Sequence, residues 1–474
     1  MEVNFLKLSL MMLVACLSSA VIASPTAYLP IGIDNHLQLQ VDHLFAISTG
    51  NPMRKPYAIN EIQAALEKIK PTHPSLYNYI ARQLDRYRGQ KKISRLGINA
   101  GLSSKKAQRI ANQRGLTSSE QLQGSLESVW RPKSFILAQL GIDYRASSTN
   151  LVPYNTFLAF SSNNLQLELG YKEHWYSPFK FSSQLISSNA KMGPSVSLST
   201  IEPIENWWRL KFDLFYTRLD TVKKGIRHGD TWHDGRPHLL GTHINIEPIN
   251  GWKLGFNRLM QFGGGPREVS FGDVVRGFID PAAKDNSHSK DDRDTELGDQ
   301  LASVTTSYHF GIDFPVEIYA ELAGEDTQGQ SNLSLGNQAT GFGVFLPKII
   351  ENIAFRYEYN RFKTGWYTNH NYRFGNTNDA AVIGHYAGDQ RKFDHGVPTE
   401  IHKAAVEVFR AIDTSWGLSL ASISNKDRSL YEKGYEFQLQ ARYIWQDRTI
   451  ESKLTAGESV FSVDYVQFSS AVYL

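Results

Sequence analysis

The stretch ENWWRLKFDLFYT, residues 205–217, divides its side chains into two sets by position. The even positions carry the apolar side chains of Trp208, Leu210, Phe212, Leu214 and Tyr216. The odd positions carry the charged side chains of Arg209, Lys211 and Asp213, with Phe215 as the one apolar exception. A repeat of two residues predicts a β-strand, because successive side chains on a strand point to opposite faces. The apolar face would contact a second sheet in a soluble sandwich, or lipid in a membrane barrel.

The same alternation continues from about residue 94 to the end of the chain. In the segment 435–445, for example, Tyr435, Phe437, Leu439, Ala441, Tyr443 and Trp445 alternate with Glu436, Gln438, Gln440 and Arg442. We count roughly sixteen to twenty such segments of about ten residues, which is the length of a tilted membrane-spanning strand. Short polar turns such as 161–164 alternate with long linkers, of which 263–301 and 362–401 are the longest. Such linkers are unusual in a compact soluble domain but normal on the outer side of a membrane barrel.

Aromatic residues near the expected strand ends favour lipid on the apolar side. These residues are Tyr171, Tyr216, Tyr308, Tyr357, Tyr359, Tyr443 and Trp445. Membrane barrels carry girdles of aromatic side chains at both interfaces with water. The chain also finishes within a strand, FSVDYVQFSSAVYL, whose backbone must pair so that no open edge remains in lipid. The sequence therefore predicts an all-β fold, an antiparallel outer-membrane β-barrel over residues 93–474, with charged side chains lining its lumen.

The bulk composition and the N-terminus narrow the class of protein. The 474 residues include 50 Lys and Arg against 47 Asp and Glu, so a net charge of +3 gives no indication of nucleic-acid binding. A mean hydropathy of −0.35 argues against a bundle of membrane helices. Residues 1–23 are typical of a secretory signal peptide, in which Lys7 precedes an apolar run. The only cysteine, Cys16, lies in this run, and lipidation at Cys16 is the rival interpretation.

Residues 24–92 differ from the rest because a helical period appears in them. Asn60 is expected to cap a first helix that Pro71 ends. A second helix is expected to begin near Pro74 and to stop at Gly89. We therefore expect a small periplasmic helical module ahead of the barrel.

Several motifs resemble those of the capsule-assembly Wzi family of outer-membrane proteins. The matching stretches are KIKP at 68–71, FNRLMQFGG at 256–264, FGD at 271–273, LGDQLA at 297–302, ELAGED at 321–326, YTNHNY at 367–372 and the final Tyr473-Leu474. The resemblance implies a barrel of about 18 strands whose lumen is closed by inward-folded extracellular loops. It also implies a non-catalytic protein that binds capsular or surface polysaccharide and helps to assemble or attach it at the cell surface.

The loop 364–393 supplies most of the candidate glycan-binding residues. They are Trp366, Tyr367, His370, Tyr372, His385 and Tyr386, with Asn376 and Asn378 nearby. Aromatic faces stack on sugar rings while amides and carboxylates bind hydroxyl groups. The alternative is a self-packed plug loop whose aromatic side chains fill the lumen, and the two interpretations are compatible. Trp175 and Tyr176 join the candidates, although the family tends to carry paired tryptophans before Gly-Pro where this chain has HWYSP, so the glycan's identity is not implied.

Other patterns fit ordinary loops better than sites of chemistry. The acidic patch Asp285, Asp291, Asp292, Asp294 and Glu296 lacks the spacing of a calcium loop. The histidines His228, His233, His238 and His243 leave a metal site as an alternative to an extracellular turn. Neither GxSxG nor HExxH occurs, and GGGP at 263–266 lacks the Lys-Ser/Thr of a phosphate loop. We therefore expect no enzyme, no metal and no cofactor.

Two rival functions remain open at this point: a diffusion porin or saccharide-specific channel, and an outer-membrane hydrolase. The expected lumen charges are Arg209, Lys211, Asp213, Glu317, Glu321, Arg356, Glu358, Glu407 and Arg442. Charges of both signs could set the selectivity of a pore or pair across the lumen. The expected partners are a surface polysaccharide, outer-membrane lipid and capsule-export machinery, with no nucleic acid, and the expected state is a monomer.

Overall fold

The computed structural model describes residues 24–48, 52–89, 91–105, 108–280, 294, 296–311, 314–325, 335–427, 429–446 and 448–474. The expected signal peptide with Cys16 lies outside the described residues. Asp285, Asp291 and Asp292 of the acidic patch lie outside them too.

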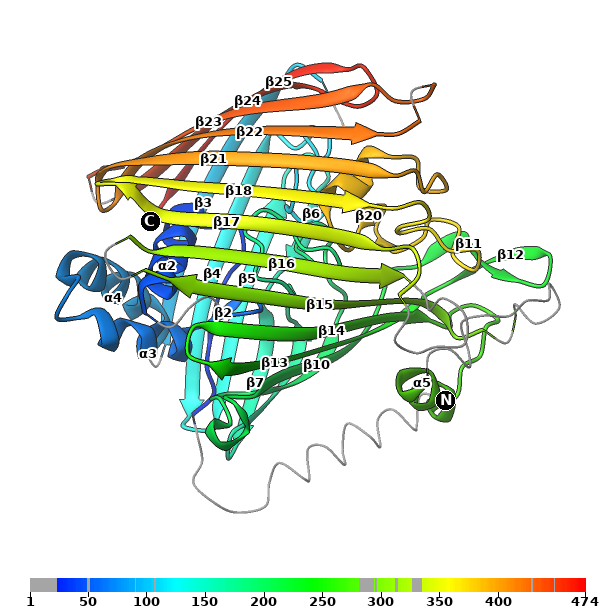
Figure 1. The fold of residues 1–474 in the computed structure, drawn as a ribbon, viewed down its shortest axis with the longest axis horizontal. Coiled ribbons are helices and arrows are strands. Elements are labelled where there is room, and N and C mark those ends of the chain that lie inside the picture. The colour runs from blue at the N-terminus through cyan, green and yellow to red at the C-terminus, as the bar shows by residue number, and fades with distance from the viewer. Residues whose placement is uncertain are drawn as a thin grey trace.

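The chain closes an antiparallel barrel of eighteen strands, which confirms the predicted fold class (Figure 1). β6 and β7 both pair with β5 and together occupy one position in the sheet. The strands are β3 (Lys91–Ser103), β4 (Leu122–Lys133), β5 (Ile136–Arg145), β6 (Asn150–Pro153), β7 (Thr156–Ser162), β8 (Leu165–Tyr171), β9 (Ser195–Thr200), β10 (Lys211–Arg218), β13 (His238–Ile249), β14 (Trp252–Phe262), β15 (Gly298–Phe310), β16 (Val316–Glu325), β17 (Ala339–Ile350), β18 (Ile353–Phe362), β21 (Thr399–Ala411), β22 (Thr414–Asn425), β23 (Lys433–Trp445), β24 (Arg448–Glu458) and β25 (Asp464–Tyr473). β25 pairs with β3, so the C-terminal strand closes the ring and leaves no edge.

The alternation of side chains divides the barrel into an apolar outside and a polar inside. On β23, Phe437 and Leu439 point outward and are exposed, whereas Gln438 and Arg442 point inward. The same outward exposure recurs on other strands at Leu102, Leu158, Phe256, Val304, Phe342, Leu420, Leu454 and Phe468. A continuous apolar surface of this size is stable only against lipid, because water would leave it unburied.

The opening stretch is shorter as a strand than its pattern predicts. β10 begins at Lys211, after a short 3-10 turn at Glu205–Trp207. Trp208 and Arg209 both have a positive φ, 51° and 56°, and lie in the turn that leads into the strand. Arg209 therefore lies in the turn before the strand, and its guanidinium lies 3.0 Å from Glu247 at the inward parity of β13.

Short turns lie at one end of the barrel and long connections at the other. The connection from β14 to β15 carries α5 (Phe271–Ile279), and the one from β18 to β21 carries the hairpin β19 (Thr377–Asn378) and β20 (Ala381–Val382). A second hairpin, β11 (Val222–His228) with β12 (Thr231–Gly235), projects from the same end (Figure 1).

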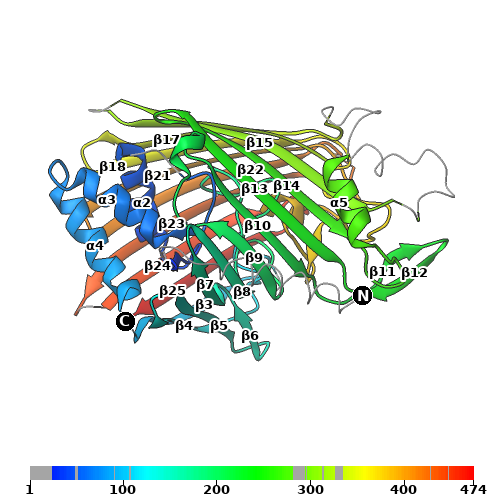
Figure 2. The same cartoon turned by 90° about the horizontal axis from the view of Figure 1, so that it is seen from below.

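The N-terminal segment forms three helices rather than the two predicted. α2 (Asn35–Ser48) was not predicted, whereas α3 (Ile59–Ile69) and α4 (Pro74–Arg88) occupy the expected stretches. Asn60 does not cap α3; the cap position is Ala58, and the Asn60 amide donates to the carbonyl of Ile201. Figure 2 shows α3 and α4 at the end of the barrel where the C-terminus lies. Among the described residues, no helix has the length and apolar character needed to cross a membrane.

The barrel lumen is occupied by the chain itself. Tyr28 and Leu29 of β1 pair with β2 (Tyr57–Ala58), and both strands belong to one hydrophobic core with α2–α4 and with inward-facing Val129, Leu137 and Phe157 of the wall. We call the lumen-filling segments the plug: residues 24–48 and 52–58, 108–121, 172–194 and 363–398. The helical segment is thus continuous with the barrel interior.

Candidate functional site

The charged face of β10 is met by the plug. Asp213 points inward, and its carboxylate lies 2.7 Å from the Arg54 guanidinium and 2.8 Å from the Lys172 ammonium. His174 Nδ1 lies 3.0 Å from the same carboxylate, and the Tyr176 hydroxyl donates to it at 2.7 Å. Burial lowers the pKa of His174 to about 4 although Asp213 opposes the shift, so the ring is neutral at neutral pH. All five side chains are buried.

Two further groups of charges join plug and wall in the same way. Lys180 of the plug places its ammonium 3.0 Å from Glu317 on β16. Arg442 on β23 lies 2.6 Å from Asp34 of the plug and 2.7 Å from Glu451 on the neighbouring strand. Of the two alternatives for the lumen charges, neither pairing across the lumen nor an open pore describes Asp213, Glu317 and Arg442, which pair with charges of the plug.

Three of the aromatic candidates lie in the core of the plug. Trp366 is fully buried, and its ring centroid lies 6.1 Å from that of Phe362. The hydroxyl of buried Tyr367 donates to the carbonyl of Gln184 and accepts from the backbone N–H of His385 at 2.6 Å. Burial lowers the pKa of His385 to about 3. These contacts join two plug segments that are far apart in the sequence, which is the arrangement of a self-packed plug.

Three other candidates are spread over the barrel interior and its outer end. Buried Tyr372 donates to the carbonyl of Gly263 at 3.0 Å. His370 is exposed, and its Nε2 lies 2.6 Å from Glu296. Tyr176 belongs to the Asp213 cluster described above.

The last two candidates, Trp175 and Tyr386, border a cavity of about 350 Å³ between the plug and one side of the wall. Tyr386 is buried, and its ring stacks on that of His385 with centroids 4.6 Å apart. Within the described part of the chain, the Tyr386 hydroxyl has no hydrogen-bond partner. Lys403 lies 5.4 Å from the centroid of the Tyr386 ring. Trp175 and Tyr386 are therefore the candidate aromatic residues that line a polar cavity.

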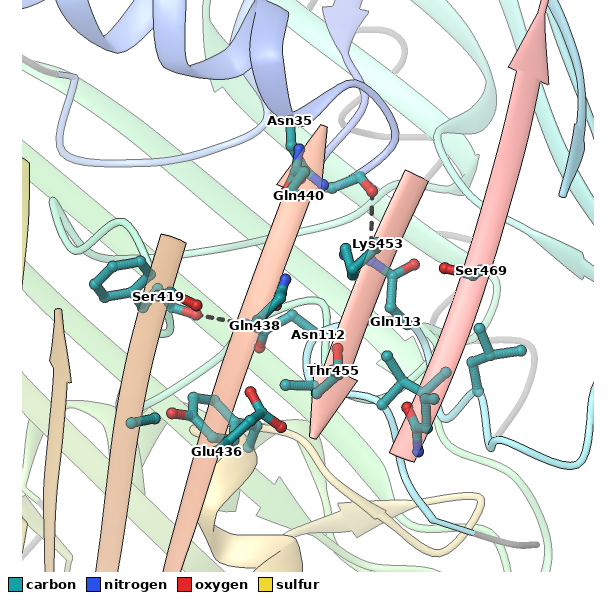
Figure 3. Close-up of a pocket in the computed structure, with 18 of the residues that line it drawn as sticks. Asn35, Asn112, Gln113, Ser419, Glu436, Gln438, Gln440, Lys453, Thr455 and Ser469 are labelled. Carbon is teal, nitrogen blue, oxygen red and sulfur yellow. Dashed lines mark hydrogen bonds between the residues drawn. The ribbon is translucent and has the colours of Figure 1, made fainter. Parts of the chain in front are cut away.

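The wall of the cavity is lined mainly by polar side chains, with Lys453 and Glu436 as charged members. Register places Ser419, Gln438, Thr455 and Gln467 in one row across β22–β25, and Gly417, Gln440, Lys453 and Ser469 in the next row (Figure 3). Among the described residues, the side-chain amides of Gln438 and Gln440 make no hydrogen bond to protein. Both amides are therefore available to a ligand, with a spacing of about 6–7 Å set by every second residue of a strand.

The plug closes the opposite side of the cavity. Figure 3 shows Asn112, Gln113 and Asn35 facing the strands that carry Gln438 and Gln440. Asn112 is fixed from behind, because its backbone N–H donates to Asn189 at 3.1 Å. Plug and wall thus contribute polar groups from opposite sides.

Charges of both signs lie at the margins of the cavity. Burial raises the pKa of Asp389, while Arg109, 3.3 Å away, opposes the shift. Glu436 accepts a hydrogen bond of 2.9 Å from the Tyr465 hydroxyl. The cavity therefore offers carboxylates, cations, amides, and aliphatic and aromatic hydroxyls, which suits a polyhydroxylated ligand.

The alternation in the sequence predicted that these wall residues face the lumen, but it did not distinguish them from other lumen-facing residues as a binding site. Gln438 and Gln440 stand at lumen positions of the predicted alternation, and Ser419, Thr455 and Ser469 repeat that parity on neighbouring strands. Only the register brings them together. Over the described residues, no group of three or more His, Cys, Asp and Glu side chains could hold a metal ion.

Comparison with known proteins gives a family match and structural likeness. The model of the family described as capsule assembly protein Wzi matches residues 99–400. A curated Klebsiella pneumoniae relative, an uncharacterized 55.8 kDa protein in the cps region, is 31% identical over 107 residues, and the match spans 21% of this chain and only 20% of the relative.

The structural likeness covers nearly the whole molecule. The solved structure of Escherichia coli Wzi, described as a carbohydrate-binding outer-membrane β-barrel involved in group 1 capsule assembly, gives a TM-score of 0.71 at 15% identity, with 96% of this chain and 99% of that chain covered. Pseudomonas aeruginosa OpdQ gives a TM-score of 0.49 at 11% identity, with 81% and 97% covered. At such identity the likeness to Escherichia coli Wzi shows a shared fold.

Proposed function

The chain belongs to the capsule assembly protein Wzi family, and on that premise we propose that it is an outer-membrane barrel that binds a capsular or surface polysaccharide. In this proposed function, the barrel holds the polysaccharide at the cell surface and catalyses no reaction. The family model covers most of the barrel, and Escherichia coli Wzi, which shares the fold, is described as carbohydrate-binding. The apolar outer surface and the exported N-terminus expected from the sequence support the membrane location.

We place the saccharide in the cavity between plug and wall. The observation that carries this assignment is the pair of unpartnered amides, Gln438 and Gln440, on a wall that also presents Thr455 and Ser419. Sugar hydroxyls both donate and accept hydrogen bonds, and a carboxamide can satisfy both roles with one side chain. Tyr386 adds an aromatic ring and an unpartnered hydroxyl at the edge.

The other candidate residues of the loop 364–393 are proposed to act outside direct saccharide contact in the cavity. Trp366, Tyr367 and His385 hold the plug against the wall and so fix the shape of the cavity. His370 is exposed at the outer end, where a longer chain leaving the cavity would pass. In this proposal the barrel is a monomer. The end of the barrel that carries α3 and α4 contacts the capsule-export machinery.

Replacing both Gln438 and Gln440 by Ala is expected to weaken saccharide binding about tenfold or more. Each lost hydrogen bond contributes about 0.5–1.5 kcal/mol, and 1.4 kcal/mol corresponds to a factor of ten. Isothermal titration of the purified barrel with oligosaccharides cut from the capsular polysaccharide of its source organism measures the change.

Leu439→Ala is the matched control, because Leu439 lies between the two glutamines and points outward into the apolar surface. It should bind as the unmodified protein does. Equal affinity of the double variant and the unmodified barrel would remove the saccharide from this cavity.

A further inference from the structure

α5 lies on the outside of the barrel wall. Its buried residue Val274 packs in one cluster with Met260 and Phe262 of β14, together with Tyr216 and Leu240. Met260 and Leu240 are register partners, and Leu240 pairs with Tyr216, at the outward parity of their strands. Figures 1 and 2 both place α5 outside the sheet near the end that carries the long connections.

The helix is fitted closely to this wall. At Gly277, a Cβ atom would lie 2.6 Å from a methyl group of Leu297 and 3.6 Å from Met260, so a larger residue would have to displace the Leu297 side chain. A capping box at Ser270 and Asp273 fixes its first turn. α5 is thus a capped helix with one face packed against the outside of the barrel.

An arginine at a lipid-facing position fixes the other end of α5. Arg258 pairs in register with Thr242 and Ala302, at the outward parity of β14. Its guanidinium donates to the carbonyls of Phe278 at 2.6 Å and Gly277 at 2.7 Å. Helix C-termini carry partial negative charge, so the cation is well placed there. An arginine that faces hydrocarbon destabilises a barrel, and α5 shields Arg258 from it.

The free face of α5 is apolar. Phe271 is 54% exposed and Ile279 73% exposed, and Val275 and Phe278 lie between them at helical spacing and are exposed as well. Because α5 packs over the outward-facing residues Tyr216, Leu240 and Met260, its stripe lies on the same side of the wall as the apolar outer surface of the barrel. The only exposed charge on the helix itself beyond its first turn is Arg276 among the described residues.

We propose that α5 is an interfacial membrane helix whose stripe Phe271, Val275, Phe278 and Ile279 inserts into the outer leaflet of the bilayer. Helices with one large apolar face lie in the plane of the membrane, about 5–10 Å into the boundary between headgroups and acyl chains. Lipid is the occupant because the stripe is continuous with the surface that the barrel already presents to lipid. The inference rests on the proposed membrane location.

Nitroxide labels on single cysteines test this placement. With Cys16→Ser as background, the full chain has no other cysteine, so Val275→Cys and Ile279→Cys label single sites. The labelled barrels are reconstituted in vesicles of phosphatidylethanolamine and phosphatidylglycerol, and accessibility to oxygen and to a water-soluble nickel chelate is measured by power saturation. Leu439→Cys on β23 is the lipid-facing reference, and Asp230→Cys in the β11–β12 turn is the aqueous reference.

Labels at 275 and 279 are expected to resemble the label at 439, with high oxygen and low nickel accessibility. A profile like that at 230 would overturn the proposal. Low accessibility to both reagents would also overturn it, because the stripe would then be covered by protein, such as a second copy of the chain. A label at 439 that is open to nickel would instead contradict the membrane location of the barrel, so the two failures are distinguishable.

Discussion

Asp213→Ala is expected to destabilise the closed barrel by about 3–5 kcal/mol, the usual consequence of removing one partner from a buried ion pair. The substitution leaves the cations of Arg54 and Lys172 without the carboxylate they share at 2.7 and 2.8 Å. It also removes the acceptor of the Tyr176 hydroxyl. The plug segments that carry these groups should separate from β10 first. Thermal unfolding in detergent, followed by circular dichroism, measures the loss.

Asp85→Ala provides the comparison at an exposed pair. Asp85 lies 3.4 Å from Arg88 on α4, and both side chains are largely in solvent, so its removal should cost about 0–1 kcal/mol. If Asp213→Ala unfolds at the same temperature as Asp85→Ala, the attachment of plug to wall by buried charge is wrong.

Trp366→Ala is expected to cost about 3–5 kcal/mol because it opens a cavity in the packed centre of the plug. Trp366 is fully buried among Phe362, Tyr367 and other plug and wall residues. Trp366→Phe keeps most of the apolar volume and should lose less stability. Thermal unfolding and saccharide titration on the same preparations separate packing from direct contact.

Saccharide binding should follow the stability of these variants. At a temperature where Trp366→Phe is folded, it should bind as the unmodified barrel does, and Trp207→Ala, in an exposed turn, should change neither quantity. A fully folded Trp366→Phe that has lost binding would contradict this packing role and would point to contact between the indole and the saccharide.

The strand pattern was predictable because the lipid and the lumen impose opposite chemistry on alternate positions. The one apolar exception in the stretch 205–217 also has a structural explanation. Phe215 has lumen parity, yet it is buried and stacks on His174 with ring centroids 3.9 Å apart, because plug rather than water fills the barrel at this height. Trp208 fitted the alternation by sequence but lies outside the strand, since periodicity alone cannot locate a turn with positive φ.

The helix α2 was missed for a related reason. Its sequence NHLQLQVDHLFAIS alternates apolar and polar residues over Leu37, Leu39 and Val41, which is the pattern of a strand. The segment is instead a helix that is buried on nearly all sides inside the lumen, where His36 and Asp42 also find partners. An amphipathic period is informative only when one face of a helix meets water.

The candidate site was only partly accessible to sequence reasoning. Aromatic residues in the long loop were predicted as a group, but their burial depends on contacts with the distant segment 172–194. The free amides Gln438 and Gln440 become a site through the register of β22–β25 and through Asn112 opposite them. Neither pairing leaves a local signal in the sequence.

The lumen is filled by the chain itself, which distinguishes this barrel from a diffusion pore. Conductance across a planar lipid bilayer tests it directly. The unmodified protein is expected to insert without a steady open current, because plug and wall are joined at Asp213, Glu317 and Arg442. A stable, stepwise current of the size that an open porin carries would show that the lumen is open.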